Sequence, residues 1–352
     1  MSKKIFITLA LSVISILMMN CFIARIVTAS SADGSKTITV IDFRGKSIIL
    51  PYPAKRIVCL IESALSGIYM LGAESQIVGI SANVYDKSVF PYYAAMDSRI
   101  QNHELPTPGN WDFVNIERVI GLKPDLVIIW SNQEESIAAM EEHHIPVYGV
   151  FIQKFNDIFK EIEDLGKLTG REERAKTLIQ ITNRHMASVC EKISQFQPKE
   201  RKKVYYMWAQ GELETSGNKS TVEELITLSG AKNVAGHIQQ EHLVVNMENI
   251  LTWNPDVIVM WVNDRKNPDD IMTSTLWQSV TAVKKQQVFE FPDVFSCDLW
   301  TLKYIHTVIL VAKWCYPNMF KEITPEDFKW ELLQELYGEK LNSEGVQKFF
   351  VK

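Results

Sequence analysis

Short apolar runs alternate with helical patterns along most of this chain. The apolar runs are rich in Val and Ile and show no polar face. Strands of this kind are buried on both faces, and helices between them cover a parallel sheet. The first half predicts strands at Arg56–Leu60, Ile77–Ile80, Leu126–Trp130 and Val147–Val150, with helices at Glu62–Leu71, Asn115–Gly121 and Gln133–His143.

The same alternation resumes after residue 200, so a second α/β unit is expected there. A hairpin with its turn at Arg44-Gly45-Lys46 is expected over Ile38–Ile49, ahead of the first unit. The second half predicts strands at Lys203–Trp208, Val257–Trp261 and Val288–Phe291, with helices at Val222–Ser229 and Met247–Trp253.

Two helical patterns separate the halves. The first covers Phe155–Leu168, and the second covers Glu172–Phe196 and ends before Pro198. The second contains about 25 residues, which at ~1.5 Å per residue span nearly 40 Å. No Gly/Ser-rich linker is present. We therefore expect an α/β fold of two Rossmann-like lobes with parallel sheets, residues 37–168 and 198–352, joined by one long backbone helix at residues 169–197.

An internal echo supports two equivalent lobes. Residues 115–130 read NIERVIGLKPDLVIIW, and residues 246–261 read NMENILTWNPDVIVMW. Asn, Glu, Pro, Asp and Trp recur at identical offsets. A Pro-Asp turn between a helix and a buried strand is common in α/β proteins, but the Asn-x-Glu at the same offset is not explained by that turn.

The N-terminus has the pattern of an export signal. Lys3 and Lys4 precede an apolar run over Ile5–Met19, and Ala29 closes a small-residue site at which cleavage would remove residues 1–29. The alternative is a retained anchor, although the run is short of the roughly 20 apolar residues that a span needs. Lipid attachment at Cys21 is a second alternative, which the residues before Cys21 match poorly.

Charge and cysteine content narrow the classes of function. The formal net charge is −5, and loss of the signal would remove only cations. This charge argues against nucleic acid or an anionic membrane surface as a partner. The remaining cysteines are scattered without CxxC spacing, so neither a disulfide scaffold nor a zinc site is expected. They are Cys59, Cys190, Cys297 and Cys315.

The residues from about 37 to 316 resemble the class III periplasmic binding proteins of ABC importers, which carry iron–siderophore complexes, haem or vitamin B12. Besides the echo, the resemblance rests on the segments ITVIDFRGKSIILPYPAKRIV, LGAESQIVGIS and TSGNKSTVEELITLSGAKNVA. It implies a ligand cleft between the lobes and one acidic docking residue per lobe for a permease dimer with its ATPase. The match puts these on Glu117 and Glu248. The alternative is two ordinary first-turn glutamates, which the helix dipole favours.

Three residues of the first lobe are ligand candidates. The resembling B12-binding proteins carry a cleft tryptophan at the offset of Trp111; its alternative role is in the core of its own lobe. Tyr92 and Tyr93 lie in a region that this resemblance puts near the cleft. Phenols ligate ferric iron or stack on a macrocycle, but adjacent tyrosines point apart, so packing is expected for at least one.

Four candidates come from the second lobe. Trp208 and Gln210 follow a predicted strand, and open α/β sheets bind ligands beyond the carboxyl ends of their strands. Arg265 would meet an anionic ligand or be an ordinary solvated arginine. The segment Phe295–Trp300 leads into a predicted helix at Leu302–Lys313. The resembling family often has an aromatic residue or an arginine in this segment, which makes Trp300 a candidate.

Metal-ion binding is the rival within the same fold. The histidines show no HExxH or HxH spacing. His103, His242 and His306 fall near the expected cleft rim, whereas His185 lies on the apolar face of the long helix and is expected to be packed. A site for free Zn, Mn or Ni needs several such ligands to converge.

The tail after residue 318 predicts one further helix. Thr324 and Pro325 form a helix start, an apolar stripe follows, and Gly338 ends it. Similar tails occur among iron-complex binders of the resembling family, which favours an iron chelate over a corrinoid.

The sequence therefore predicts a monomeric, extracytoplasmic substrate-binding protein without a cofactor or resident metal. Its expected ligand is a siderophore complex, haem or corrinoid. An exported α/β enzyme is one alternative, but GxSxG, GxGxxG and P-loop motifs are absent. A storage or sensing module on the same fold is another.

Overall fold

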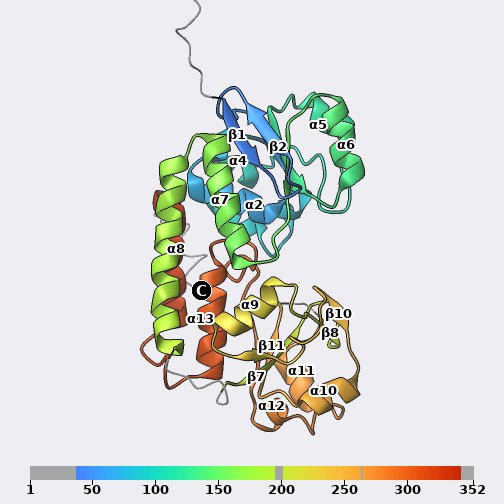
Figure 1. The fold of residues 1–352 in the computed structure, drawn as a ribbon, viewed down its shortest axis with the longest axis vertical. Coiled ribbons are helices and arrows are strands. Elements are labelled where there is room, and N and C mark those ends of the chain that lie inside the picture. Colours follow the sequence, from blue (N-terminus) through green and yellow to red (C-terminus); the bar gives the residue numbers. More distant parts are fainter. Residues whose placement is uncertain (1–36, 195–200, 263–264, 342–352) are drawn as a thin grey trace, which may run out of the picture. The chain divides into compact units, whose positions relative to one another are not determined.

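The first lobe is built on a parallel sheet with the strand order β4-β3-β5-β6. The computed structural model describes residues 37–194, 201–262 and 265–341 (Figure 1), so the expected signal and Cys21 lie outside it. The residues of β3 and β6 are all buried, which explains their unbroken apolar character. The strands are β3 (Ile57–Cys59), β4 (Ile77–Ile80), β5 (Leu126–Trp130) and β6 (Val147–Val150).

The second lobe repeats this arrangement. Its parallel sheet has the order β9-β7-β11-β12. Counted along the chain, the order is second, first, third, fourth strand in both sheets. The predicted α/β fold with two Rossmann-like lobes is confirmed. The strands are β7 (Lys203–Met207), β9 (Lys232–Asn233), β11 (Val257–Met260) and β12 (Val288–Glu290); β9 was not predicted.

The two copies of the echo fold alike. Each begins with an asparagine that caps a short helix, α5 (Ile116–Gly121) or α10 (Met247–Trp253). The Asn115 side chain accepts a hydrogen bond from the Arg118 backbone N–H at 3.0 Å, and Asn246 accepts one from the Asn249 N–H at 2.9 Å. Such caps satisfy donors that the first helical turn leaves unpaired.

The aspartate of each copy ties its turn to the neighbouring strand. Asp125 accepts hydrogen bonds from the backbone N–H groups of Lys55 and Arg56, both at 2.9 Å. Asp256 accepts one from the Lys203 N–H, also at 2.9 Å. The recurrent Asp therefore fixes the amino ends of β3 and β7, the strands beside β5 and β11.

Two long helices lie between the sheets in sequence, α7 (Phe155–Thr169) and α8 (Glu172–Ile193). Their crossing is close, because a Cβ on Gly166 would lie 2.6 Å from the Cβ of Ala175. Helix α8 also contacts α2 (Glu62–Leu71), α13 (Tyr304–Cys315) and α14 (Pro325–Tyr337) (Figure 1). The predicted end of the long helix, Phe196, lies outside the described residues, and the proposed lobe boundaries stay a prediction.

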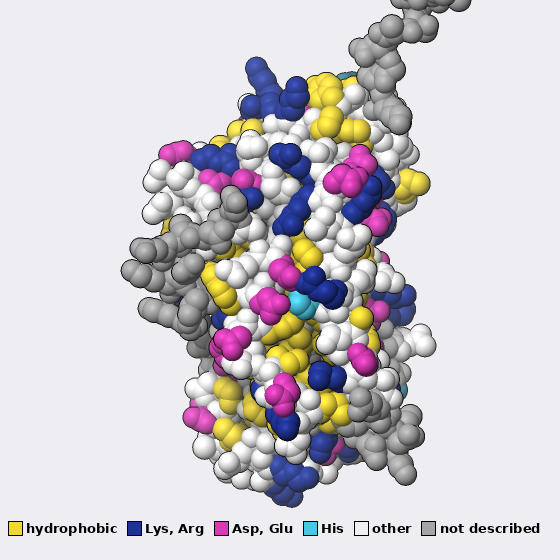
Figure 2. Space-filling model, turned by 90° about the vertical axis from the view of Figure 1, so that its left-hand side faces the viewer, with side chains coloured by type: hydrophobic (Ala, Val, Ile, Leu, Met, Phe, Trp, Pro, Cys, Tyr) yellow, Lys and Arg dark blue, Asp and Glu magenta, His cyan; other side chains and the backbone are white. Residues whose placement is uncertain are grey.

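Helix α14 is the extra C-terminal helix expected from the sequence. Thr324 occupies its N-cap position without a side-chain cap bond, and Pro325 is the first helical residue. Glu335 binds Arg184 and His185 of α8, the latter at 2.7 Å. Figure 2 shows that acidic and basic side chains are mixed on the face that carries α8. His185 is thus engaged with α14, in line with its expected packing role.

The remaining elements surround the sheets. Strands β1 (Ile38–Ile41) and β2 (Ser47–Leu50) form the predicted hairpin. Within the described ranges, no helix has both the length and the hydropathy of a membrane span. The other helices and strands are α3 (Phe90–Met96), α4 (Ser98–Gln101), α6 (Glu134–Glu142), α9 (Thr221–Leu228), α11 (Pro268–Thr273), α12 (Thr281–Lys284), β8 (Glu214–Thr215) and β10 (Leu243–Val244), with single 3-10 turns at Glu74–Gln76, Ala82–Tyr85 and Gly338–Leu341.

Candidate functional site

Three tryptophans cluster at the carboxyl edge of the second sheet. Trp208 directly follows β7, Trp261 directly follows β11, and Trp300 precedes α13. The rings of Trp208 and Trp300 lie 6.3 Å apart with planes 14° apart. The Trp261 ring lies 5.6 Å from Trp208 and 6.0 Å from Trp300. Beyond the carboxyl ends of parallel strands is where open α/β sheets bind ligands.

Polar groups hold these rings in place. The Trp208 indole N–H donates to the Ser216 hydroxyl at 2.8 Å, and the Trp300 backbone N–H donates to the Asp298 carboxylate at 2.8 Å. The His242 ring is stacked on Trp208, with 6.2 Å between centroids, and its Nε2 lies 2.5 Å from Glu214. The cluster therefore offers half-buried apolar ring surface that is already oriented.

A pocket of about 620 Å³ is lined by residues of both lobes. Lys87 comes from the segment that follows β4, while Gln210 and Arg265 come from segments that follow β7 and β11. Gln210 and Arg265 were sequence candidates; Lys87 was missed, although it too lies beyond the carboxyl end of a predicted strand. The lining residues are Asp86, Lys87, Ser88, Ala209, Gln210, Val262, Arg265 and Val294.

Aromatic stacking joins the two lobes near this pocket. Tyr92 lies on Phe295 with ring centroids 4.5 Å apart and planes 7° apart. Phe295 follows Val294 of the pocket lining. Burial and the Asp293 carboxylate raise the pKa of Tyr92 well above its usual value. A neutral, half-buried phenol that already stacks on protein is consistent with the packing alternative for Tyr92.

Tyr93 points into the core instead. Its side chain is fully buried, and its hydroxyl donates to a Glu62 carboxylate oxygen at 2.6 Å. Burial is the main cause of its raised pKa. A ligand has no access to Tyr93 in this position, and Tyr93 is therefore not part of the proposed site. Sequence cannot show which of two adjacent helical residues faces inward when both are tyrosine.

Glu62, which is half-buried, lies beside two buried charged side chains of the other lobe, Asp298 and Lys303. Burial raises its pKa to about 6; nearby Lys303 opposes that shift and Asp298 adds to it. Lys303 is completely buried, 3.6 Å from an Asp298 carboxylate oxygen and 3.8 Å from the Phe295 ring centroid. Asp298 thus contacts both Lys303 and the backbone of Trp300, which connects this cluster to the tryptophans.

The other first-lobe candidates lie on the surface. Trp111 has 59% of its area exposed, and its backbone carbonyl accepts a hydrogen bond from Gln133. It does not line the interlobe pocket. Glu117 and Glu248 are both exposed in the first turns of α5 and α10, at matching positions of the echo.

The candidate histidines do not converge. His103 stacks against Tyr85, and His306 is buried with its Nδ1 3.2 Å from the Ser296 carbonyl oxygen. His242 lies on Trp208. Across the described ranges, no group of three or more His, Cys, Asp or Glu side chains could hold a metal ion.

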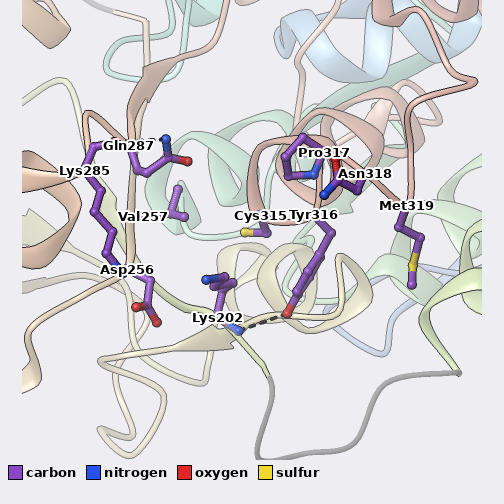
Figure 3. A pocket seen from close by; sticks show the side chains of 10 residues that line it. All are labelled: Lys202, Asp256, Val257, Lys285, Gln287, Cys315, Tyr316, Pro317, Asn318 and Met319. Carbon is purple, nitrogen blue, oxygen red and sulfur yellow. Dashed lines mark hydrogen bonds between the residues drawn. The ribbon is translucent and has the colours of Figure 1, made fainter.

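A separate pocket of about 770 Å³ lies at the opposite edge of the second sheet (Figure 3). Lys202 and Asp256 directly precede β7 and β11, and the Lys202 backbone N–H donates to the Tyr316 hydroxyl at 2.9 Å. Every lining residue comes from the second half of the chain, so this pocket is not the cleft between lobes.

Comparison with known proteins decides the family. Residues 57–294 match the periplasmic binding protein family, which is more than half of the chain. The chain belongs to this family. The two lobes and the interlobe pocket agree with that membership, and the chain is a substrate-binding protein of an ABC transporter rather than an enzyme.

Individual relatives are distant. The chain is 27% identical to an uncharacterized ABC transporter substrate-binding lipoprotein, YvrC, of Bacillus subtilis, over 81% of this chain and 87% of the relative. It is 24% identical to the molybdate-binding protein MolA of Haemophilus influenzae, over 91% and 95%. The structure of MolA bound to molybdate has a TM-score of 0.72 at 21% identity, covering 85% of this chain and 97% of MolA.

The fold is shared with proteins of varied cargo. The structure of Helicobacter pylori CeuE in a nickel–histidine complex has a TM-score of 0.73 at 17% identity, covering 89% of this chain and 99% of CeuE. Membership implies a permease and an ATPase as partners and a place of action outside the cytoplasm.

Proposed function

We propose that this chain captures an anionic metal complex, of the iron–siderophore class, in the interlobe pocket and delivers it to an ABC permease. The observation that carries the proposal is the pair of cations, Lys87 from one lobe and Arg265 from the other, on the lining of one pocket. Cations that line a cleft focus its field and attract anions. A ligand held by both would bridge the two lobes.

Size and surface support a chelate. A volume of about 620 Å³ lies within the range of small-molecule sites, roughly 300–1,000 Å³. Gln210 supplies a hydrogen-bonding amide to the lining. Trp208 and Trp261 directly precede the lining residues Ala209 and Val262, and their rings pack together with centroids 5.6 Å apart; they would offer flat apolar surface to an organic chelate that extends beyond the lining. Haem and corrinoids share this need for flat surface and belong in the same test.

A tetrahedral oxyanion is the second candidate. It is favoured by the similarity to a molybdate-binding protein over 91% of the chain together with the same two cations. A free transition-metal ion is less well supported, because the described residues bring no three metal-ligating side chains together.

Delivery would use the two lobes symmetrically. Glu117 and Glu248 would dock on cations of a permease dimer, one glutamate per subunit. Export would occur through residues 1–29, with cleavage after Ala29 or lipid attachment at Cys21. The protein would act as a monomer on the transporter.

Tryptophan fluorescence tests the ligand class. Residues 30–352 would be titrated with ferric hydroxamate, catecholate and citrate chelates, haemin, cobalamin, molybdate, and free Zn, Mn and Ni. Saturable quenching by a ferric chelate that weakens with added salt supports the proposal, because screening weakens exposed ion pairs. Quenching by molybdate alone supports the second candidate, and quenching by a bare metal alone contradicts both.

Variants locate the site. Lys87→Gln and Arg265→Gln should each weaken binding about tenfold or more. Lys285→Gln, in the pocket of Figure 3, is the matched control and should bind like the parent. Equal loss in all three variants would indicate a general charge effect and would count against this pocket.

A further inference from the structure

Two strongly exposed apolar side chains occupy equivalent places in the two lobes. Phe113 has 66% of its area exposed and Val244 has 70%, the highest values among the large hydrophobic residues that the structure describes. Each lies two residues before the capping asparagine of its echo, Asn115 or Asn246. The same offset in both lobes makes coincidence a poor explanation.

The fold itself turns these side chains outward. The next residues, Val114 and Val245, are buried in the cores of their lobes, as are Val119 and Ile250 of the following helices. This is the spacing of a hydrophobic staple, which fixes how the chain enters a helix. Successive side chains of an extended segment alternate in direction, so the residue before each buried valine must face solvent.

Both positions are also held rigidly. The Asn110 side chain accepts hydrogen bonds from the backbone N–H groups of Asp112 and Phe113 at 2.8 and 2.9 Å. Val244 belongs to β10, where it pairs with Glu214 of β8. Apolar groups held in place before contact lose little conformational entropy on binding.

We propose that Phe113 and Val244, one per lobe, are the apolar anchors of a pseudo-two-fold surface that docks on the membrane-embedded dimer of the importer. This rests on the proposed function. Glu117 and Glu248 follow their anchors by four residues and are exposed. Exposed ion pairs contribute little by themselves, so a stable complex needs desolvated apolar contacts beside them.

Two equivalent exposed patches, one in each lobe, indicate what kind of partner would bind them. A partner with a two-fold axis offers the same recess twice, and two equivalent patches on one chain match it. Each recess would be apolar beside a cation. A lipid surface fits poorly, because the acidic neighbours would be repelled by anionic headgroups. Trp111 and Leu251 extend the same two segments with further exposed apolar area.

The test measures binding to the permease–ATPase complex of the source organism, reconstituted in nanodiscs. Phe113→Ser and Val244→Ser should each weaken binding to the complex about tenfold, and the double variant more than either. Ile49→Ser is the matched control, since Ile49 is 60% exposed on the unrelated β-hairpin, and it should bind like the parent. Unfolding temperatures would be recorded for all four variants.

The outcomes separate the two proposals. If the parent chain does not bind the complex, the proposed delivery function fails. If the parent binds and Glu117→Ala/Glu248→Ala does not, while Phe113→Ser/Val244→Ser binds like the parent, only the apolar anchors are refuted. Loss of ferric-chelate quenching in Phe113→Ser would assign that residue to the ligand cleft and would also overturn the inference.

Discussion

The Tyr92 ring stacks on the Phe295 ring with their centroids 4.5 Å apart and their planes 7° apart. Tyr92 lies on α3 of the first lobe, and Phe295 follows β12 of the second. Tyr93 meets the same Phe295 ring edge-on at 5.6 Å. One buried phenylalanine of the second lobe therefore packs against two aromatic side chains of the first lobe, which holds the two lobes together at this point.

Replacing Tyr92 separates packing from ligand contact. Tyr92→Phe keeps the stacked ring but loses the hydrogen bond of the hydroxyl to Asp293, so we expect stability to fall by about 1 kcal/mol and ligand affinity to be unchanged. Tyr92→Ala loses the stack and should lower the free energy of unfolding by about 1–3 kcal/mol. Urea unfolding and fluorescence titration measure the two effects. A Tyr92→Phe variant that folds normally and loses affinity would show that the hydroxyl contacts ligand.

The aspartates of the echo should both stabilise the protein, Asp125 more than Asp256, because Asp125 accepts hydrogen bonds from two backbone N–H groups and Asp256 from one. Asp125 and Asp256 each accept backbone hydrogen bonds at 2.9 Å at the start of a central strand. Alanine at either position should cost about 1–3 kcal/mol, because strand N–H groups lose their acceptor. Asparagine keeps one acceptor oxygen and is the control, with a smaller loss. A large effect in one lobe with none in the other would refute their equivalence.

Glu161 of α7 should make the protein less stable as pH rises. Its side chain is 2% exposed, and its Oε1 has no hydrogen-bond partner among the described residues. Burial, reinforced by Asp298 and Asp164, raises its pKa to about 8. Between pH 4.5 and 8 the folded state binds a proton that the unfolded state has lost, so stability falls as pH rises.

Replacing the Glu161 carboxylate by an amide measures how much its ionisation lowers the stability of the protein. At pH 8 the free energy of unfolding of Glu161→Gln, measured with denaturant, should exceed that of the parent by a few kcal/mol. The difference should shrink toward pH 5, where the parent is protonated in the folded state. A constant difference across this range would mean that Glu161 does not titrate as its burial requires.

His306 should make the protein less stable as pH falls, which is the opposite of the effect expected for Glu161. It is 2% exposed on α13, and burial lowers its pKa to about 4. Between pH 6.5 and 4 the unfolded state binds a proton that the folded state does not, so stability is lost as pH falls. The loss should reach about 3 kcal/mol near pH 4.

The comparison with His306→Leu isolates this effect. The variant also loses the contact of Nδ1 with the Ser296 carbonyl, which lowers its stability at every pH. Its stability should nevertheless decline less steeply than that of the parent between pH 6.5 and 4. Parallel declines would assign the acid sensitivity to other groups.

Local patterns were enough for the architecture. Apolar runs without a polar face predicted the buried strands of both sheets, because burial on two faces leaves no room for alternation. The echo predicted two equivalent lobes. Its recurring residues form helix caps, hydrophobic staples and turn aspartates, whose contacts reach only a few residues along the chain or to a neighbouring strand. The small strands β8, β9 and β10 were missed because two residues carry no period.

The site depended on tertiary structure. The strand-end rule predicted Trp208 near a cleft, and the family resemblance predicted Trp300 there. Their packing with Trp261 became visible only in the tertiary structure. The presence of Lys87 and Arg265 on one pocket depended on the positions of both lobes. The full burial of Tyr93 beside the half-buried Tyr92 was likewise decided by the tertiary structure. The spacing of apolar residues shows which side of a segment packs into its own lobe. Contacts between the lobes, such as that of Tyr92 with Phe295, join residues about two hundred positions apart. No local sequence pattern predicts such pairs.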